Sequence, residues 1–380
     1  MGTPSRAFIP DQWRILPEPV SDFEHEIIMN ILFLGGGWGT AGQRAGALRR
    51  LGHTVHQVDP DRMVPTGRFQ SRLHWETGGL LCEKSVTSHV LTDIGASRFD
   101  LTWVDNGRYV GPLLVHELQS RYGPVLNYNV DDPYGRRDRF SWSLYKRAVS
   151  AYNLVAVVRE ENVAEAQALK ARKVIRVYRS ADEVAHAPRA LTAEDHARWD
   201  SEVVFAGTWM RERGPFLVDL LRRGVPLTLY GNGWQRAKEW PLLEPVWKGP
   251  DLSTADDYAK AIQCAKVVLG LLSKGNRDLH TTRSLEVPSL GGVFCAERTP
   301  EHKFLYQEGE ESVFWSDAAE CAEVCLRLLN DDARRTEIGR RGRVRCLRNG
   351  TMNEQILAHI ISEVPPVRTK DDFAHNLREQ

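Results

Sequence analysis

The chain has 380 residues, with 50 Lys plus Arg against 50 Asp plus Glu, so its formal net charge is zero. This balance gives no reason to expect nucleic acid or an acidic membrane surface as a partner. Because the sequence contains no run of about 18 apolar residues and no charged-then-apolar leader, we expect a cytoplasmic protein without a transmembrane segment. The length predicts two domains, each large enough for its own core.

The six cysteines show neither a CxxC pair nor the His-rich spacing of zinc sites. Cys321 and Cys325 are four residues apart among Ala, Val and Leu, which fits the apolar face of one helix. We therefore expect buried, reduced thiols and no metal site.

Residues 1–27 are rich in Pro and charge and predict a surface extension. From residue 28, short apolar runs alternate with helix-like segments. Strands are predicted at 31–35, 54–60, 100–106, 124–132, 152–160 and 173–180, and helices at 43–53, 111–123 and 161–172. This alternation predicts an α/β fold with a doubly wound parallel sheet, which makes 28–190 a Rossmann-like N-terminal domain.

A polar segment at 191–200 predicts a linker, after which the same alternation restarts. Ser253, followed by Asp256, is the predicted cap of a helix. Strands are predicted at 201–209, 226–234, 266–272, 291–296 and 312–315, and helices at 215–224 and, with a break near residue 331, at 318–350. We therefore expect a second Rossmann-like domain over 201–355, followed by a C-terminal helix and tail over 356–380.

The first predicted strand leads into a glycine-rich turn, Gly37-Trp38-Gly39-Thr40-Ala41-Gly42, that matches the dinucleotide pattern G-x-G-x-x-G. Asp59 closes the second strand, where an acid would bind a ribose. However, Gly35 and Gly36 separate the turn from its strand, so the match is out of place. A tight turn without a nucleotide explains the glycines equally well, and both alternatives stay open.

The richest stretch of the sequence is 276–299, NRDLHTTRSLEVPSLGGVFCAERT. It follows one apolar run and leads into another, which predicts a strand, a polar loop, a short helix that carries Glu286, and a further strand. Anionic ligands bind at the carboxyl ends of parallel strands, beside helix N-termini. The loop is therefore a candidate site for the phosphates of a nucleotide.

The second half contains, in order, VVFAGTW, LTLYGNGW, RSLEVPSLGG, ERT and EGEESVFW. This series resembles the C-terminal domain of GT-B-fold glycosyltransferases, in particular the spore-maturation-type branch of the large retaining group. The resemblance is dense over 201–350 and looser in the first half. It implies two Rossmann-like domains that face each other across a cleft, with a nucleotide-diphosphate sugar bound by the C-terminal one.

The resemblance also implies roles for single residues. Asp278 and Glu286 stand where that group has two glutamates eight residues apart; the second would bind the ribose hydroxyls, and the first, here one carbon shorter, lies near the donor sugar. Arg213 stands where the group has a phosphate-binding lysine. The implied donor-binding residues are Gly207, Thr208, Arg213, Tyr230, Gly231, Trp234, Lys248, Lys274, Thr281, Thr282, Arg283 and Glu286, with Lys248 on a loop beside the nucleobase.

Asp131 and Asp132 end a predicted strand of the first domain, and one of them would orient or deprotonate the acceptor. With Asp278 and His280 they are the candidate catalytic residues. The acceptor-binding candidates are Gly36, Gly37, Trp38, Gly39 and Asp105.

The resemblance implies a retaining, metal-independent hexosyltransferase of polysaccharide or glycoconjugate biosynthesis, with UDP as a candidate carrier and no cofactor beyond its nucleotide sugar. Its acceptor would be a saccharide, a protein or a small molecule, and oligomerisation stays open. Two alternatives remain: an NAD(P)-dependent oxidoreductase using residues 35–42, and a nucleotide-sugar-binding protein without catalysis.

Overall fold

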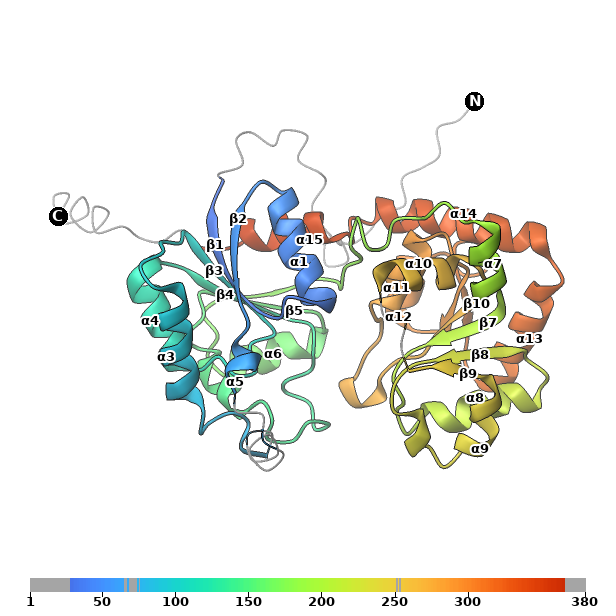
Figure 1. Cartoon of the computed structure of the whole chain (residues 1–380), viewed down its shortest axis with the longest axis horizontal. Coiled ribbons are helices and arrows are strands. Elements are labelled where there is room, and N and C mark those ends of the chain that lie inside the picture. The colour runs from blue at the N-terminus through green and yellow to red at the C-terminus, as the bar shows by residue number, and fades with distance from the viewer. Residues whose placement is uncertain are drawn as a thin grey trace.

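The computed structural model describes residues 28–64, 67, 74, 76–250, 252 and 254–365. The predicted extension over 1–27 and the tail beyond residue 365 lie outside this part of the chain. Within it, the chain forms two parallel six-stranded sheets, each flanked by helices (Figure 1). This confirms the predicted α/β fold class with two doubly wound domains.

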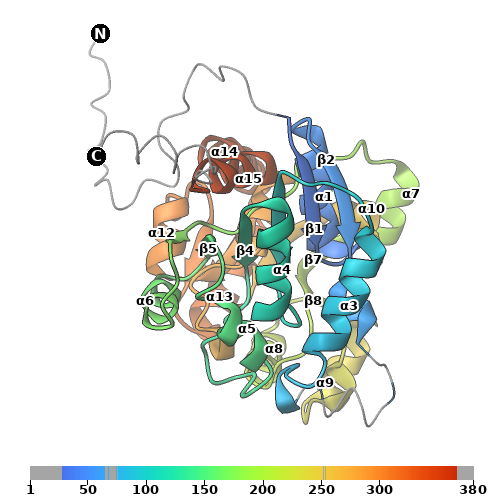
Figure 2. The same cartoon turned by 90° about the vertical axis from the view of Figure 1, so that its left-hand side faces the viewer.

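The first sheet has the strand order β2-β1-β3-β4-β5-β6, and all of its pairs are parallel. Helices α3 and α4 cover the face turned away from the second domain (Figures 1 and 2). The elements of this domain are β1 Asn30–Leu34, α1 Gly39–Arg50, β2 Thr54–Val58, the 3-10 turn Pro60–Met63, α3 Glu83–Ile94, β3 Leu101–Asp105, α4 Pro112–Tyr122, β4 Val125–Asn129, α5 Ser143–Ala148, β5 Leu154–Val157, α6 Glu160–Ala168 and β6 Val174–Arg176.

The alternation of side chains along β1 explains why this sheet is covered on both faces. Leu32 and Leu34 belong to the core beneath α3 and α4, whereas Ile31 and Phe33 belong to the core beneath α1 and the C-terminal helix. Successive residues of a strand point to opposite faces, so an unbroken apolar run needs cover on both sides.

The second sheet has the order β12-β11-β10-β7-β8-β9 and is also parallel throughout. Its short edge strand β9 was not predicted. The elements are α7 Ala193–Trp199, β7 Ser201–Ala206, α8 Arg213–Arg222, β8 Leu227–Tyr230, α9 Trp240–Leu243, β9 Trp247–Gly249, α10 Ala255–Gln263, β10 Ala265–Gly270, α11 Arg283–Ser289, β11 Phe294–Glu297, α12 Pro300–Leu305, β12 Val313–Trp315, α13 Ala318–Leu329 and α14 Asp332–Arg348, with 3-10 turns at Trp234–Arg236, Glu244–Val246 and Lys274–Asn276.

Two local expectations differ from the structure. The segment predicted as a linker contains α7, because Thr192 and Asp195 form a capping box that starts a helix there. Helix α10 is capped by Thr254, whose side chain accepts from the backbone N–H of Asp257. The cap therefore lies one residue later than predicted, and Ser253 is outside the described residues.

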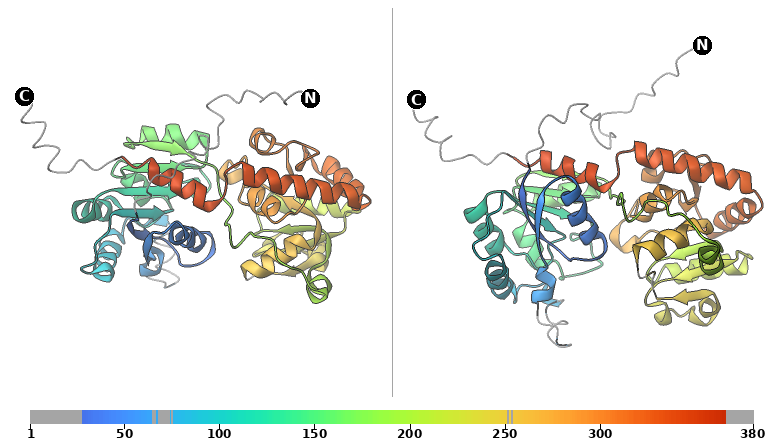
Figure 3. Two further views of the ribbon diagram at one scale, coloured as in Figure 1. Left: turned by 90° about the horizontal axis from the view of Figure 1, so that it is seen from above. Right: turned by 45° about the horizontal axis from the view of Figure 1, so that its top comes forward.

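The chain crosses between the domains twice, and the two crossings lie side by side. Ala181, after β6, forms a parallel bridge with Met352, which precedes α15 Asn353–Ser362. Helix α14 lies along the second domain, while α15 packs against α1 of the first (Figure 3). Arg50 of α1 fastens this junction through ion pairs with Asp182, Glu183 and Glu354.

Two glycines in helices provide a matched test of how closely α14 packs against the end of α11. A Cβ at Gly339 of α14 would lie 2.3 Å from the backbone oxygen of Gly291, next to α11, whereas one at Gly46 of α1 would meet only the end of the Arg50 side chain, at 3.6 Å. We predict that Gly339→Ala lowers the free energy of unfolding by about 1–3 kcal/mol, because it overpacks the helix contact. Gly46→Ala should be neutral or stabilising by up to about 1 kcal/mol. Urea unfolding measures both, and equal effects would contradict the packing described.

Candidate functional site

The candidate site is built around the loop that joins β10 to α11, residues 271–282. Residues that follow the carboxyl ends of β4, β5 and β6 in the first domain contact this loop of the second. Arg277 within it has φ 54°, a left-handed conformation that a non-glycine residue adopts only when its surroundings hold it there. The two sheets thus meet at their carboxyl edges, where open α/β sheets bind ligands.

Asp278 lies in this loop and is buried between two arginines of the first domain. Arg159, directly after β5, donates to its Oδ1, and Arg179, after β6, donates to the same oxygen at 3.1 Å. Burial, together with the positive charge of Arg179, lowers the pKa of Arg159. The candidate catalytic acid is therefore engaged in an ion-pair cluster between the domains.

Arg277 forms a second connection between the domains. Its guanidinium is bidentate to Asp132, with both N–O distances 2.7 Å, and also contacts Glu165 of α6 at 2.9 Å. Burial alone would raise the pKa of Asp132, but hydrogen bonds from Arg277 and Asn162 lower it. Asp131 lies beside it, half-buried, and accepts from Asn106. Of the two predicted candidates for acceptor activation, Asp131 is the more accessible.

His280 is buried at the end of the same segment. Its Nε2 accepts the backbone N–H of Arg179 at 3.1 Å, so the proton must sit on Nδ1, which faces the Glu301 carboxylate. Burial lowers the pKa of this imidazole, which keeps it neutral. As a result, both ring nitrogens of this candidate catalytic residue have partners.

Glu286 lies on the first turns of α11, as predicted, and is only 3% exposed. Its Oε2 accepts from Tyr258 (3.0 Å) and from Arg283, while Oε1 is 3.6 Å from Nε2 of His186. Burial would raise the pKa of this carboxyl, but Arg283 and His186 outweigh it and lower the pKa. Glu286 is therefore ionised, and Oε1 is the oxygen with acceptor capacity left.

The cations predicted to bind phosphate surround this loop. Arg213 begins α8 and donates to the backbone oxygens of Thr208 (2.8 Å) and Leu271 (3.0 Å). Burial lowers its pKa to about 10, so it stays charged at neutral pH. Lys274 is more than half exposed and pairs with Glu297. Arg283 stacks on the ring of Tyr258 and is about one third exposed.

The ends of β7 and β8 approach each other closely at Gly207 and Gly231. A Cβ at Gly231, which has φ 134°, would lie 2.0 Å from the Gly207 oxygen, so only glycine fits there. Trp234, predicted to line the cleft, is instead fully buried, because its indole N–H donates to that same oxygen and its ring packs edge-on against Phe205. Tyr230 turns its ring toward Trp199 of α7.

The loop position predicted for Lys248 is wrong. The residue belongs to the edge strand β9, where it lines a groove of about 830 Å³ together with the amino-end residues Ser201, Leu227 and Lys266. That groove is at the opposite edge of the second sheet. Thr281 and Thr282, by contrast, lead into α11: the N–H of Thr281 donates to Ser284, and the oxygen of Thr282 accepts from Glu286.

In the first domain, the predicted acceptor residues divide into two kinds. Gly36, Gly37 and Gly39 form the turn between β1 and α1, and Trp38 at its tip is 72% exposed. Asp105, by contrast, is buried and bidentate to Arg44, at 2.6 and 2.8 Å. The Asp105 carboxylate is thus occupied within the domain and does not line a surface. Asp59 caps its own turn by accepting from the N–H of Asp61.

Sequence reasoning did not find four residues of the site: Arg159, Arg179, His186 and Tyr258. A signal existed for the two arginines, because each is the next-to-last residue of a predicted strand of the first domain, 152–160 and 173–180, where a buried sheet ends at the cleft edge. His186 and Tyr258 gave no such signal, since only the fold brings them to Glu286.

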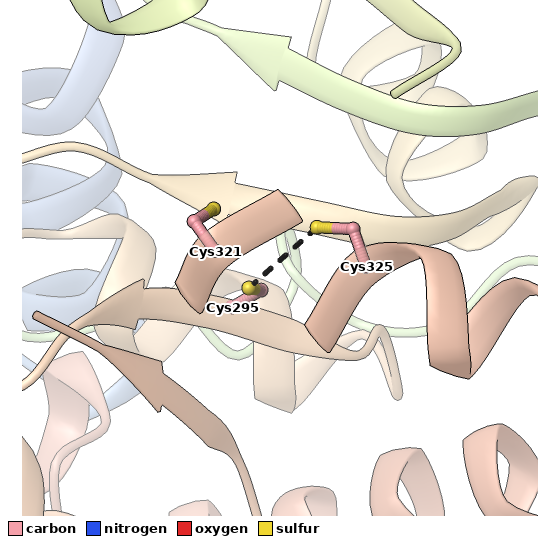
Figure 4. A group of neighbouring side chains, drawn as sticks. All are labelled: Cys295, Cys321 and Cys325. Carbon is pink, nitrogen blue, oxygen red and sulfur yellow. Dashed lines mark hydrogen bonds between the residues drawn. The ribbon is translucent and has the colours of Figure 1, made fainter. Parts of the chain in front are cut away.

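All six cysteines are buried, free thiols. Cys321 and Cys325 lie on α13 and face Cys295 of β11, with 4.0 Å between the Sγ atoms of Cys295 and Cys325 (Figure 4). All three belong to the apolar core beneath α8 and α13. This confirms the predicted apolar helix face.

Solved structures with a similar fold share the two-domain architecture across nearly their whole length. Sucrose-phosphate synthase from Thermosynechococcus elongatus is 13% identical, with a TM-score of 0.64, covering 87% of this chain and 97% of its own. HepE of Anabaena, solved with UDP-glucose, is 14% identical (TM-score 0.61; 88% and 98% covered). A glycosyltransferase from Rickettsia africae is 11% identical (TM-score 0.57; 89% and 98% covered). At these identities the likeness defines the fold, which is GT-B.

Residues 211–361 match the family model described as "Glycosyl transferase-like". No curated protein sequence matches the chain significantly. The matched segment contains Arg213, Asp278 and Glu286, in the domain that the sequence resemblance singled out. The chain therefore has the GT-B fold and, over residues 211–361, matches a glycosyl transferase-like domain. Residues 37–42, which match the dinucleotide pattern, lead from β1 into α1. Across the described ranges, no helix has the length and apolar character needed to cross a membrane.

His302 offers a test of how the short helix α11 is held. Its Nδ1–H donates to the oxygen of Glu297 (2.7 Å), and its neutral Nε2 accepts from Ser284 of α11 (2.8 Å). Burial lowers its pKa from 6.5 to about 4. Between these values the unfolded chain binds a proton that the native protein does not, so this contribution to stability is complete above pH 6.5 and is lost as the pH falls.

We predict that His302→Gln removes up to about 1.4 kcal/mol per pH unit from the pH dependence of unfolding between pH 6 and 4.5. Urea unfolding at several pH values measures the slope, and His89→Gln, at an exposed site, is the control. If the free energy of unfolding changed with pH equally in wild type and His302→Gln, the buried neutral imidazole would be contradicted.

Proposed function

We propose that the protein transfers a sugar from a nucleotide-diphosphate sugar to an acceptor hydroxyl, with retention of anomeric configuration and without a metal ion. The observation that carries the proposal is the set of charged groups around the β10–α11 loop: an ionised, buried Glu286 beside Arg283, with Arg213 and Lys274 close to the same strand ends. They lie in the segment that matches the glycosyl transferase-like model. A carboxylate can accept hydrogen bonds from ribose hydroxyls, and guanidinium groups can pair with phosphates through charged hydrogen bonds.

The donor would enter at the carboxyl edge of the second sheet. Arg213, Lys274 and Arg283 would hold the diphosphate and stabilise it as it leaves, which is the work that a metal ion does in other transferases. Glu286 Oε1 would accept hydrogen bonds from the ribose hydroxyls. The Arg283 side chain would then move from the Glu286 carboxylate to a phosphate of the donor. Because HepE, a fold neighbour, was solved with UDP-glucose, uridine diphosphate sugars are the first donors to test.

The acceptor would bind against the first domain, where Trp38 offers an exposed indole for stacking on a sugar ring. Asp131 is our candidate for orienting the acceptor hydroxyl, because Asp132 is held by Arg277. Retention would be read from the anomeric signals of the product by NMR. Metal independence predicts full activity in EDTA.

The nucleotide screen is the primary test. UDP, GDP, ADP and NADH are compared by thermal shift, and we expect at least one nucleoside diphosphate to raise the melting temperature while NADH does not. A shift with NADH alone would overturn the transferase proposal in favour of the oxidoreductase.

Catalysis is tested with Glu286→Gln, which keeps the shape of the side chain but removes its charge. We predict a loss of kcat/KM for the donor of about 10- to 100-fold, since a charged hydrogen-bond partner is worth about 1.5–3 kcal/mol. Glu323→Gln, at an exposed position of α13, is the control. If wild type binds nucleotide but transfers no sugar to water or to any acceptor tried, the non-catalytic alternative is correct.

Arg213 provides a separate test of the diphosphate contact. We predict that Arg213→Ala weakens nucleoside diphosphate binding by about 10-fold or more, whereas nucleoside affinity changes little, because the lost partner is a phosphate. Arg223→Ala, at the far end of the same helix and paired with Asp219, should leave both affinities unchanged. Isothermal titration measures them, and an equal loss for nucleoside and diphosphate would place Arg213 away from the phosphates.

A further inference from the structure

Asp278 occupies the position where related transferases carry the first of two glutamates, yet its surroundings are unlike an open sugar pocket. The residue is 7% exposed. Its Oδ1 accepts from both Arg159 and Arg179, and both arginines belong to the other domain. The carboxylate is thus a shared partner of two guanidinium groups.

The same two arginines also hold the backbone on either side of Asp278. Arg159 Nε donates to the oxygen of Asn276 at 2.6 Å, and Arg179 Nη1 donates to the oxygen of His280 at 2.6 Å. The backbone N–H of Arg179 reaches Nε2 of His280 as well. Five contacts from two arginines therefore hold residues 276–280.

Arg159 and Arg179 are in turn fixed to their own domain. Both donate to the oxygen of Val130, after β4, and Arg159 also donates to the oxygen of Asp131. The loop is thus connected through two buried arginines to the segment that holds the acceptor-activating candidate. A planar guanidinium with five donors suits this work, because it binds several oxygens at once in fixed directions.

We propose that Asp278 is a positioning residue, which clamps Arg159 and Arg179 so that the first domain fixes the donor-binding loop of the second. This inference rests on the proposed function. It assigns to two N-terminal-domain arginines a role in donor binding, although neither need touch the donor. It also explains the shorter side chain: the gap between the arginines accommodates Asp, and a glutamate would displace one of them.

The charge balance at the clamp makes the carboxylate indispensable. Without Asp278, two buried guanidinium groups would repel each other with no anion between them, and an uncompensated buried charge is strongly unfavourable. The carboxylates of Asp132 and Glu301 are already paired, with Arg277 and Arg176 respectively. The loop would then separate from the first domain.

The closing experiment compares Asp278→Asn, Asp278→Glu, Arg179→Met and the double variant Asp278→Asn/Arg179→Met with wild type. Stability is measured by urea unfolding, and the affinities for UDP and GDP, which carry no sugar, by isothermal titration. The surface pair Lys266–Glu202 provides the control substitution Glu202→Gln. Each single substitution at the clamp should weaken binding of the preferred diphosphate by about tenfold or more.

The double variant should be no weaker than the worse single one, since both changes remove one clamp. Asp278→Glu should be impaired, even though it restores the residue that related transferases carry. Unchanged diphosphate affinity in Asp278→Asn, additive effects in the unfolding cycle, or wild-type diphosphate affinity of Asp278→Glu would each overturn the clamp. Because the unfolding cycle needs no ligand, it decides on the clamp even if wild type binds no nucleotide and the proposed function fails.

Discussion

The arrangement of this protein depends on ion pairs buried where its two domains meet. Buried charges are tolerated only when they are paired and hydrogen-bonded. Arg159 and Arg179 satisfy that condition through Asp278, and Asp132 does so with Arg277. Every one of these pairs joins the first domain to the β10–α11 loop of the second. The relative position of the domains and the conformation of the loop are therefore set by the same contacts.

These contacts divide the loop into two parts that have different partners. Its front, residues 276–280, faces the first domain and is held by Arg159, Arg179 and Asp132 of that domain. Its rear, from Thr281 into α11, belongs to the second domain alone and carries Glu286 among Arg283, Tyr258 and His186. A donor held by the rear half would thus lie next to a front half whose shape the first domain dictates, which couples donor binding to the acceptor side.

Most of the fold was predictable, because parallel sheets buried on both faces consist of short apolar runs that a local pattern reveals. The edge strand β9 was missed for the same reason: Trp247–Gly249 is only three residues long and its middle residue is an exposed lysine. Among site residues, Glu286 on its short helix was predicted correctly, since spacing along the chain places it. The location of Trp234 was wrong because burial of an indole depends on the hydrogen-bond acceptor that Gly207 provides across the sheet.

The sequence by itself determined the two doubly wound domains, the polar loop between β10 and α11, and the position of the acids Asp278 and Glu286 within it. These follow from periodicity and from spacings of a few residues. Only the tertiary structure decided the partners of those acids. Arg159 and Asp278 are 119 residues apart, and Asp132 and Arg277 are 145 apart. Electrostatic pairing at such separations depends on how two independently folded sheets are placed, and no local pattern in the chain encodes that placement.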